Sequence, residues 1–148
     1  MSQLLEQITS AWKDAMRAGD ATRKETLSLV RAAVKNAQID SKTEMDDAAV
    51  QSVIEREAKK RREAALEYDK AGRPELAQKE RDELGVLQDF LPQQLSEDEL
   101  RAVVAQTIAE TGAQSPKDMG KVMGALRPKI AGRADGKLAS ELVKTALG

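Results

Sequence analysis

The side chains in this sequence that could do chemistry are carboxylates and cations, because the chain contains no cysteine and no histidine. Their absence excludes thiol nucleophiles, imidazole acid–base catalysis and nearly every kind of zinc site. A Ser–Lys dyad would need a different spacing from that of Ser115 and Lys117. The run 97–99 (Glu-Asp-Glu) fits a helix start, where the helix dipole favours carboxylates. We therefore predict no catalytic residue, no cofactor and no bound metal ion.

Basic residues gather in two segments. Residues 56–62 contain five cations, which on a helix would either meet nucleic-acid phosphates or, as we favour, form a solvated face paired with Glu55, Glu57 and Glu63. Residues 115–148 carry a net charge of +4, against −5 for the preceding 114 residues. The seven cations of that second segment are Lys117, Lys121, Arg127, Lys129, Arg133, Lys137 and Lys144. Such an asymmetry can mark a nucleic-acid surface, although it also fits ordinary surface variation.

Two glycine-containing motifs lie within the second basic segment. Gly120 and Gly124 are four residues apart in a predicted helix, which would let another helix or a ligand backbone approach closely. The second motif, residues 132–137 (GRADGK), lacks the spacing of a nucleotide-binding loop and has no preceding strand. It fits either an anion-binding turn at a helix N-terminus or a simple capped turn.

The elements that must position these residues are all helices, because every periodic stretch has a period near 3.6. The first helix carries the stripe Leu5, Ile8, Trp12, Met16 and ends at Gly19. A capping box at 22–25 should open the second helix, and residues 40–44 should form a loop. A third helix over 46–71 stops at Gly72, and Pro74 opens a fourth that Pro92 closes. The short link predicts a long antiparallel helical hairpin.

Residues 92–95 read as a domain boundary. Ser96 and Glu99 form a second capping box, with Leu95 and Leu100 placed as a hydrophobic staple. This helix should end at Gly112, a short helix should run from 115 until Pro128 interrupts it, and 129–135 should connect to a last helix capped by Asp135. Aromatic residues make up only 2% of the chain, which disfavours an all-β fold. We predict an all-α protein, with an N-terminal helical domain at 1–92 and a small three-helix domain at 95–148.

The compartment follows from what the sequence lacks. The first six residues have no apolar core typical of a signal peptide, and no run approaches 18 apolar residues. We expect a cytoplasmic protein without a membrane partner, and the absence of cysteine fits a reducing compartment.

Three motifs in order resemble the YqeY family, over essentially the full chain. These are FLPQQLSEDEL at 90–100, KDMGKVMG at 117–124 and GRADGK at 132–137. That family is similar to the tail of GatB, a component of the glutamine-dependent aspartyl/glutamyl-tRNA amidotransferase; this tail holds tRNA while the chemistry resides elsewhere. The resemblance implies an all-α, non-catalytic module. A carbon–nitrogen ligase activity with glutamine as amido donor would be a label inherited from the larger protein.

The resemblance also implies a partner and a set of contacts. The expected partner is tRNA, with tRNA amidotransferase or the aminoacyl-tRNA machinery as a further possibility. Lys121, Arg133 and Lys137 would contact phosphates, and Lys117, Arg127 and Lys129 would add weaker contacts. Gly120, Gly124, Gly132 and Gly136 would let a backbone approach. The alternative function is a protein–protein adaptor that binds through the helical hairpin, and an exposed apolar stripe on the hairpin would favour it.

Overall fold

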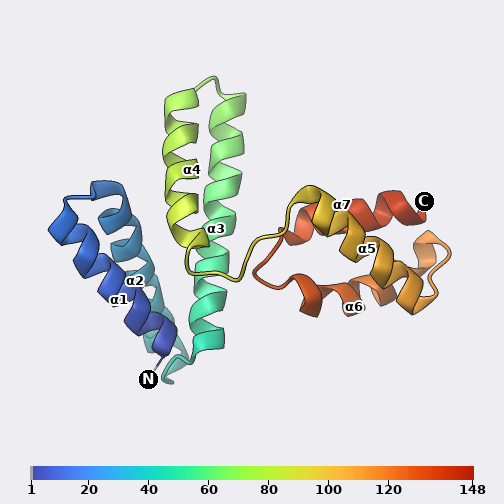
Figure 1. The fold of residues 1–148 in the computed structure, drawn as a ribbon, viewed down its shortest axis with the longest axis horizontal. Coiled ribbons are helices and arrows are strands. Elements are labelled where there is room, and N and C mark those ends of the chain that lie inside the picture. Colours follow the sequence, from blue (N-terminus) through green and yellow to red (C-terminus); the bar gives the residue numbers. More distant parts are fainter. Residues whose placement is uncertain (1) are drawn as a thin grey trace. The chain divides into compact units, whose positions relative to one another are not determined.

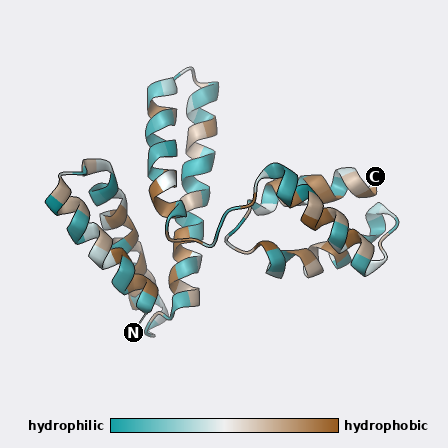
Figure 2. Ribbon diagram, viewed as in Figure 1, coloured by the Kyte–Doolittle hydropathy of each residue, from teal (hydrophilic) through white to brown (hydrophobic). Residues whose placement is uncertain are grey.

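The computed structural model describes residues 2–148, and within them the chain is all-α, as predicted, with seven α-helices, one 3-10 helix and no strand (Figure 1). The chain forms two compact units, one ending at Pro92 and the other comprising Gln93–Gly148. Along the helices, hydrophobic residues gather on one side and hydrophilic residues on the other (Figure 2). No helix within residues 2–148 is long and apolar enough to cross a membrane.

The first unit contains α1 (Gln3–Ala18), α2 (Ala21–Ser41), α3 (Asp47–Lys70) and α4 (Pro74–Gln88). Helix α1 ends at Gly19, whose φ of +69° is the left-handed conformation that glycine adopts without strain. The core draws on all four helices. Its fully buried large side chains include Ile8, Leu27, Val30, Val34, Val50, Ile54 and Leu87.

The start of α2 differs from the prediction. The helix begins at Ala21, so Thr22 lies inside its first turn and the capping box predicted there is wrong. Asp20 is the N-cap, and its carboxylate accepts a hydrogen bond from the Arg23 amide at 3.1 Å. Asp and Thr both cap helices well, and here the residue directly after Gly19 takes the position because α1 has already ended.

Helices α3 and α4 run antiparallel side by side, joined by only three residues (Figure 1). Within the basic segment at 56–62, Arg61 is buried between the two helices. Its guanidinium lies 3.9 Å from Glu57 on α3 and 3.3 Å from Glu83 on α4. Lys60 also pairs with Glu57, at 3.2 Å. Part of this basic segment is therefore committed to holding the hairpin together.

The second unit contains α5 (Glu97–Thr111), the 3-10 helix η1 (Pro116–Asp118), α6 (Met119–Ile130) and α7 (Gly136–Leu147). The Ser96–Glu99 capping box is present, with hydrogen bonds of 3.1 and 3.0 Å. The three helices enclose a core of their own. Its buried residues are Leu100, Val104, Val122, Met123, Leu126, Ile130, Ala139 and Val143.

Helix α6 does not stop at Pro128 as the sequence analysis expected, and continues to Ile130. Proline removes one intrahelical donor and crowds the carbonyl four residues earlier, here that of Gly124. Both residues are exposed, so water can satisfy the freed carbonyl. The connector is accordingly shorter than the predicted 129–135 and starts at Ala131.

Candidate nucleic-acid interface

The outer side of α6 brings together several of the predicted contact residues. Gly120, Lys121, Gly124, Arg127 and Pro128 are all exposed and recur every three or four residues, so they share one helix face, which we call the α6 basic face. The opposite face is buried in the unit's core. Lys117 in the preceding 3-10 helix is exposed as well.

Five cations of the second unit make no hydrogen bond or close ion pair, whereas two nearby carboxylates accept hydrogen bonds. Among residues 2–148, no hydrogen bond or ion pair is made by the side chains of Lys117, Lys121, Arg127, Lys137 and Lys144. By contrast, Asp118 accepts a hydrogen bond from the Gln114 amide at 2.9 Å, and this bond is the main cause that lowers the pKa of Asp118. Asp135 accepts one from the Lys137 amide at 3.3 Å, which caps α7. Both carboxylates therefore bind backbone amides first, and Lys121 acts on Asp118 only through a weaker electrostatic attraction that also lowers the pKa of Asp118.

Lys129 is engaged inside the unit. Its ammonium lies 2.6 Å from a carboxylate oxygen of Glu110 and donates a hydrogen bond to the Thr107 hydroxyl at 3.1 Å. The hydrogen bond from Lys129 is the main cause that lowers the pKa of Glu110. This side chain ties α6 to α5, so two of its three N–H donors are already used within the unit.

Arg133 and Gly132 are also engaged, with the segment that opens the unit. The Arg133 guanidinium Nε donates to the Gln93 carbonyl at 3.1 Å, and the Arg133 carbonyl accepts from the Leu95 amide at 2.8 Å. The Gly132 carbonyl accepts from the Gln94 side-chain amide at 2.6 Å. Gly132 has a φ of +72°, a left-handed conformation that explains glycine at this position. The third motif thus holds residues 93–95 in place.

The remaining predicted glycines are open. A Cβ atom built on Gly120, Gly124 or Gly136 would meet nothing within 4 Å outside its own chain neighbours and local helix backbone. No helix of this unit packs against them, so their missing side chains expose backbone to solvent. Of the ten predicted contact residues, the structure therefore gathers five on or beside the α6 basic face, namely Lys117, Gly120, Lys121, Gly124 and Arg127.

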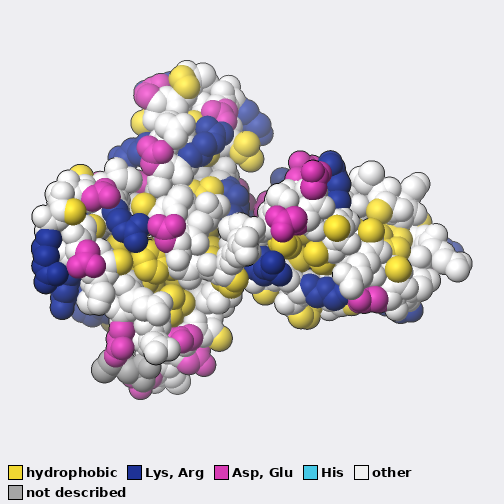
Figure 3. Space-filling view, in the orientation of Figure 1, with side chains coloured by type: hydrophobic (Ala, Val, Ile, Leu, Met, Phe, Trp, Pro, Cys, Tyr) yellow, Lys and Arg dark blue, Asp and Glu magenta, His cyan; other side chains and the backbone are white. Residues whose placement is uncertain are grey.

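The charge of the second unit is mixed when all of it is counted. Residues 93–148 contain eight basic and seven acidic residues, because α5 contributes four acids that offset the +4 of residues 115–148. Figure 3 shows both signs on the face of this unit turned to the viewer. Any attraction to phosphate must therefore come from a local face, not from the unit's overall charge.

Two of the three aromatic rings, those of Trp12 and Phe90 in the first unit, lie beneath arginines. Arg31 stacks over Trp12 at 4.0 Å from the ring centre, and Arg23 lies 5.5 Å from that of Phe90. The Trp12 indole also donates to the Ser28 hydroxyl at 2.7 Å. The second unit contains no aromatic residue at all. Base stacking on aromatic rings is accordingly a poor candidate for binding.

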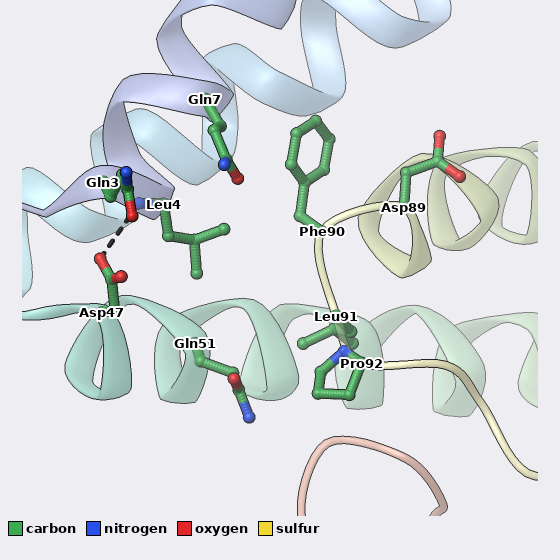
Figure 4. A pocket seen from close by; sticks show the side chains of 9 residues that line it. All are labelled: Gln3, Leu4, Gln7, Asp47, Gln51, Asp89, Phe90, Leu91 and Pro92. Atoms are coloured by element: carbon green, nitrogen blue, oxygen red, sulfur yellow. Dashed lines mark hydrogen bonds between the residues drawn. The ribbon is translucent and has the colours of Figure 1, made fainter.

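The first unit also contains a pocket of about 350 Å³ to which no sequence motif points, drawn in Figure 4. Its lining residues are Gln3, Leu4, Gln7, Asp47, Gln51, Asp89, Phe90, Leu91 and Pro92. The two carboxylates of this pocket, those of Asp47 and Asp89, already have partners. Asp47 accepts from the Ser2 hydroxyl, which lowers its pKa, and from the Leu4 amide at 3.0 Å, while Asp89 pairs with Arg23 at 2.8 Å. The pocket offers amides and apolar side chains but no free acid or base.

No cluster of acidic residues within 2–148 is arranged to hold a metal ion.

With this geometry in view, comparison with known proteins gives one family match. The family model described as Yqey-like protein matches residues 5–147. The chain belongs to the YqeY-like family. The match covers both units, so the resemblance seen in the three motifs is confirmed over nearly the whole length.

Curated relatives carry the name altered inheritance of mitochondria protein 41, mitochondrial. The one from Pyrenophora tritici-repentis is 27% identical over 98% of this chain and 81% of its own length. Those from Eremothecium gossypii and Kluyveromyces lactis are 35% and 32% identical, over 59% and 70% of this chain. These matches span 48% and 58% of those two relatives. The names of these relatives associate them with mitochondria.

Proposed function

We propose that this YqeY-like protein is a non-catalytic accessory module that binds tRNA, contacting its phosphates through the α6 basic face and Lys117. The observation that carries the proposal is that Lys117, Lys121 and Arg127 are exposed and make no hydrogen bond or close ion pair within residues 2–148. Exposed cations without an internal partner are free to replace the counterions of a phosphate backbone.

The open glycines support the same surface. Gly120 and Gly124 leave a strip of bare helix between Lys121 and Arg127, so a sugar–phosphate backbone could lie against the helix while the cations reach phosphates on either side. Lys137 and Lys144 on α7 add exposed charge in the same unit. Recognition would rest on phosphate position and shape, since the unit has no aromatic ring for stacking.

The choice of tRNA rests on the resemblance to the tail of the amidotransferase component GatB. By the same resemblance, the tRNA amidotransferase or aminoacyl-tRNA machinery is the protein assembly that this module would serve. We propose a cytoplasmic location for this chain, and a mitochondrial one belongs to the names of its relatives.

A titration of fluorescent bulk tRNA at two salt concentrations tests the proposal. The test variant is the triple change Lys117→Glu/Lys121→Glu/Arg127→Glu. The matched control is Lys13→Glu/Lys59→Glu/Lys79→Glu, which makes the same change in net charge at exposed sites of the first unit. We expect the wild type and the control to bind, with affinity falling as salt rises, and the test variant to lose most binding at both salts.

Equal losses in both triple variants would show nonspecific charge attraction and contradict the assigned surface. No binding by the wild type at low salt would reject tRNA binding by this chain altogether. The alternative function, a protein–protein adaptor that binds through the helical hairpin, would then be the one to test. Among residues 2–148, the hairpin exposes one large hydrophobic side chain, Leu66, and so lacks the apolar stripe that would favour an adaptor.

A further inference from the structure

Helix α2 has a second apolar side that its own unit does not cover. Leu27, Val30 and Val34 are buried in the core, but Leu29 is 52% exposed and Ile39 is 61% exposed. Ala32 and Asn36 lie between them and are exposed too. Within residues 2–148, three large hydrophobic residues are more than half exposed, and two of them, Leu29 and Ile39, share this one helix face.

The spacing of this face is that of a coiled-coil seam. Leu29, Ala32, Asn36 and Ile39 follow one another at intervals of three, four and three residues. In a heptad this places Leu29 and Asn36 at a, and Ala32 and Ile39 at d. We call these four residues the α2 seam.

Hollows lie on both sides of the seam. A groove of about 320 Å³ runs between α2 and α3 beside Ala33 and Ala37, with Val53 in its wall. A second hollow, of about 420 Å³, lies beside Ile39 and is lined by Lys35 and Lys42 among others. A helix laid along the seam would therefore find space for its flanking side chains on either side.

We propose that the α2 seam is a self-association surface, covered by α2 of a second copy of this chain in parallel orientation. Charge and polarity favour this occupant. In a parallel pair, Asn36 at a meets its own counterpart, where paired asparagines hydrogen-bond and fix register. Lys35 at g lies opposite Asp40 at e of the partner subunit, so two symmetry-related attractions flank the seam.

The antiparallel arrangement fits less well. Aligning Leu29 with Ile39 of the partner subunit sets Lys35 against its own counterpart at the centre of the seam. It also leaves Asn36 opposite an alanine, where its amide has no matching partner. Lys35 and Asp40 make no hydrogen bond or ion pair within residues 2–148, so both side chains are available to a second copy.

Because the chain contains no cysteine, single cysteines report the orientation without background. In the full chain, Asn36→Cys and Ala32→Cys should each form a disulfide-linked dimer under mild oxidation. A parallel seam brings identical positions together, at the close approach that a disulfide needs. Lys59→Cys, exposed on α3, is the matched control and should stay unlinked. If only a mixture of the 32 and 36 variants links, the pair is antiparallel and the proposed orientation is wrong.

Sedimentation velocity over a range of concentrations tests association without a covalent link. We expect a concentration-dependent dimer for the wild type, a monomer for Ile39→Glu, and about tenfold tighter association for Asn36→Ile, since isoleucine is favoured at a. A species that remains a defined dimer distinguishes this result from unfolding, which would produce larger aggregates. Lys35→Glu should weaken the dimer and Lys35→Glu/Asp40→Lys should restore it. Monomers for both wild type and Asn36→Ile at every concentration would overturn the proposal.

Discussion

At the scale of single residues, the Asp118 carboxylate accepts hydrogen bonds from backbone amides, and its pKa is lowered as a result. Hydrogen bonds from the Gln114 and Ser115 amides hold the pKa of Asp118 below its ordinary value of 3.8. Since the folded pKa is the lower one, this stabilisation is complete above the unfolded pKa and is lost as pH falls through the folded value. The stability that Asp118 gives to the loop before α6 therefore depends on pH.

We predict that Asp118→Asn lowers the thermal midpoint of the second unit at pH 7, because the amide is a weaker acceptor for the two backbone donors. Below about pH 4 the difference from wild type should shrink, since Asp118 is then increasingly protonated. Circular dichroism melts over a range of acidic to neutral pH measure this. Asp98→Asn, whose side chain is 95% exposed, is the control and should change the midpoint little. A gap between wild type and Asp118→Asn that is constant with pH would refute the role.

Residue types could be predicted from the sequence better than residue roles. The cations of 115–148 are visible in the sequence, but the engagement of Lys129 depends on Glu110, nineteen residues away. The hydrogen bond of Arg133 depends on Gln93, forty residues away in the sequence. Local spacing carries no information about such partners, so the sequence could not show that the Arg133 Nε, predicted among the phosphate contacts, is bound to a backbone carbonyl. The fold alone separates it from Lys121 and Arg127.

At the scale of elements, the α6 basic face contains two glycines, Gly120 and Gly124, with open space where their side chains would be. A glycine destabilises a helix by about 1 kcal/mol relative to alanine. No neighbouring element in this unit packs against Gly120 or Gly124 to offset that cost. We predict that Gly124→Leu retains or raises the stability of the second unit but weakens tRNA binding, because the side chain fills the bare strip of backbone. Thermal melts and the tRNA titration measure the two effects.

Helix α4 supplies a matched control for this change. Gly85 is also helical and exposed, and a Cβ atom there meets nothing within 4 Å. Gly85→Leu should therefore gain similar helix propensity in the first unit without altering tRNA affinity. Unchanged affinity in Gly124→Leu would remove the glycine strip from the proposed contact surface while leaving the cations in place.

The helices themselves could be predicted because each carries a 3.6-residue apolar period and a recognisable stop. Errors fell where two local signals compete. Asp20 and Thr22 are both good caps, and only the end of α1 decides between them. Pro128 looks like a terminator, yet an exposed proline in a last turn costs one hydrogen bond that water can replace. The N-cap of α2 and the end of α6 depend on neighbouring structure and on exposure, and the local sequence pattern contains neither.

At the scale of the whole molecule, each unit has its own core. The second, Gln93–Gly148, is of a size at which a single core leaves little stability to spare. Leu126 is fully buried in it. Removing a buried leucine side chain costs about 2–5 kcal/mol. Leu126→Ala should therefore unfold the second unit, or nearly so, under conditions in which the first remains folded.

The chain provides a selective probe for this prediction. Its single tryptophan, Trp12, lies in the first unit, half-buried beneath Arg31, so its fluorescence reports on that unit alone. Circular dichroism reports helices of both units. With Leu126→Ala we expect loss or early melting of part of the helical signal while the tryptophan transition keeps its midpoint. Leu27→Ala, in the first core, is the reciprocal control and should shift the tryptophan transition. If Leu126→Ala moves the tryptophan midpoint as much as the helical one, the two units unfold as one cooperative body, and the thermodynamic independence inferred from their separate cores is wrong.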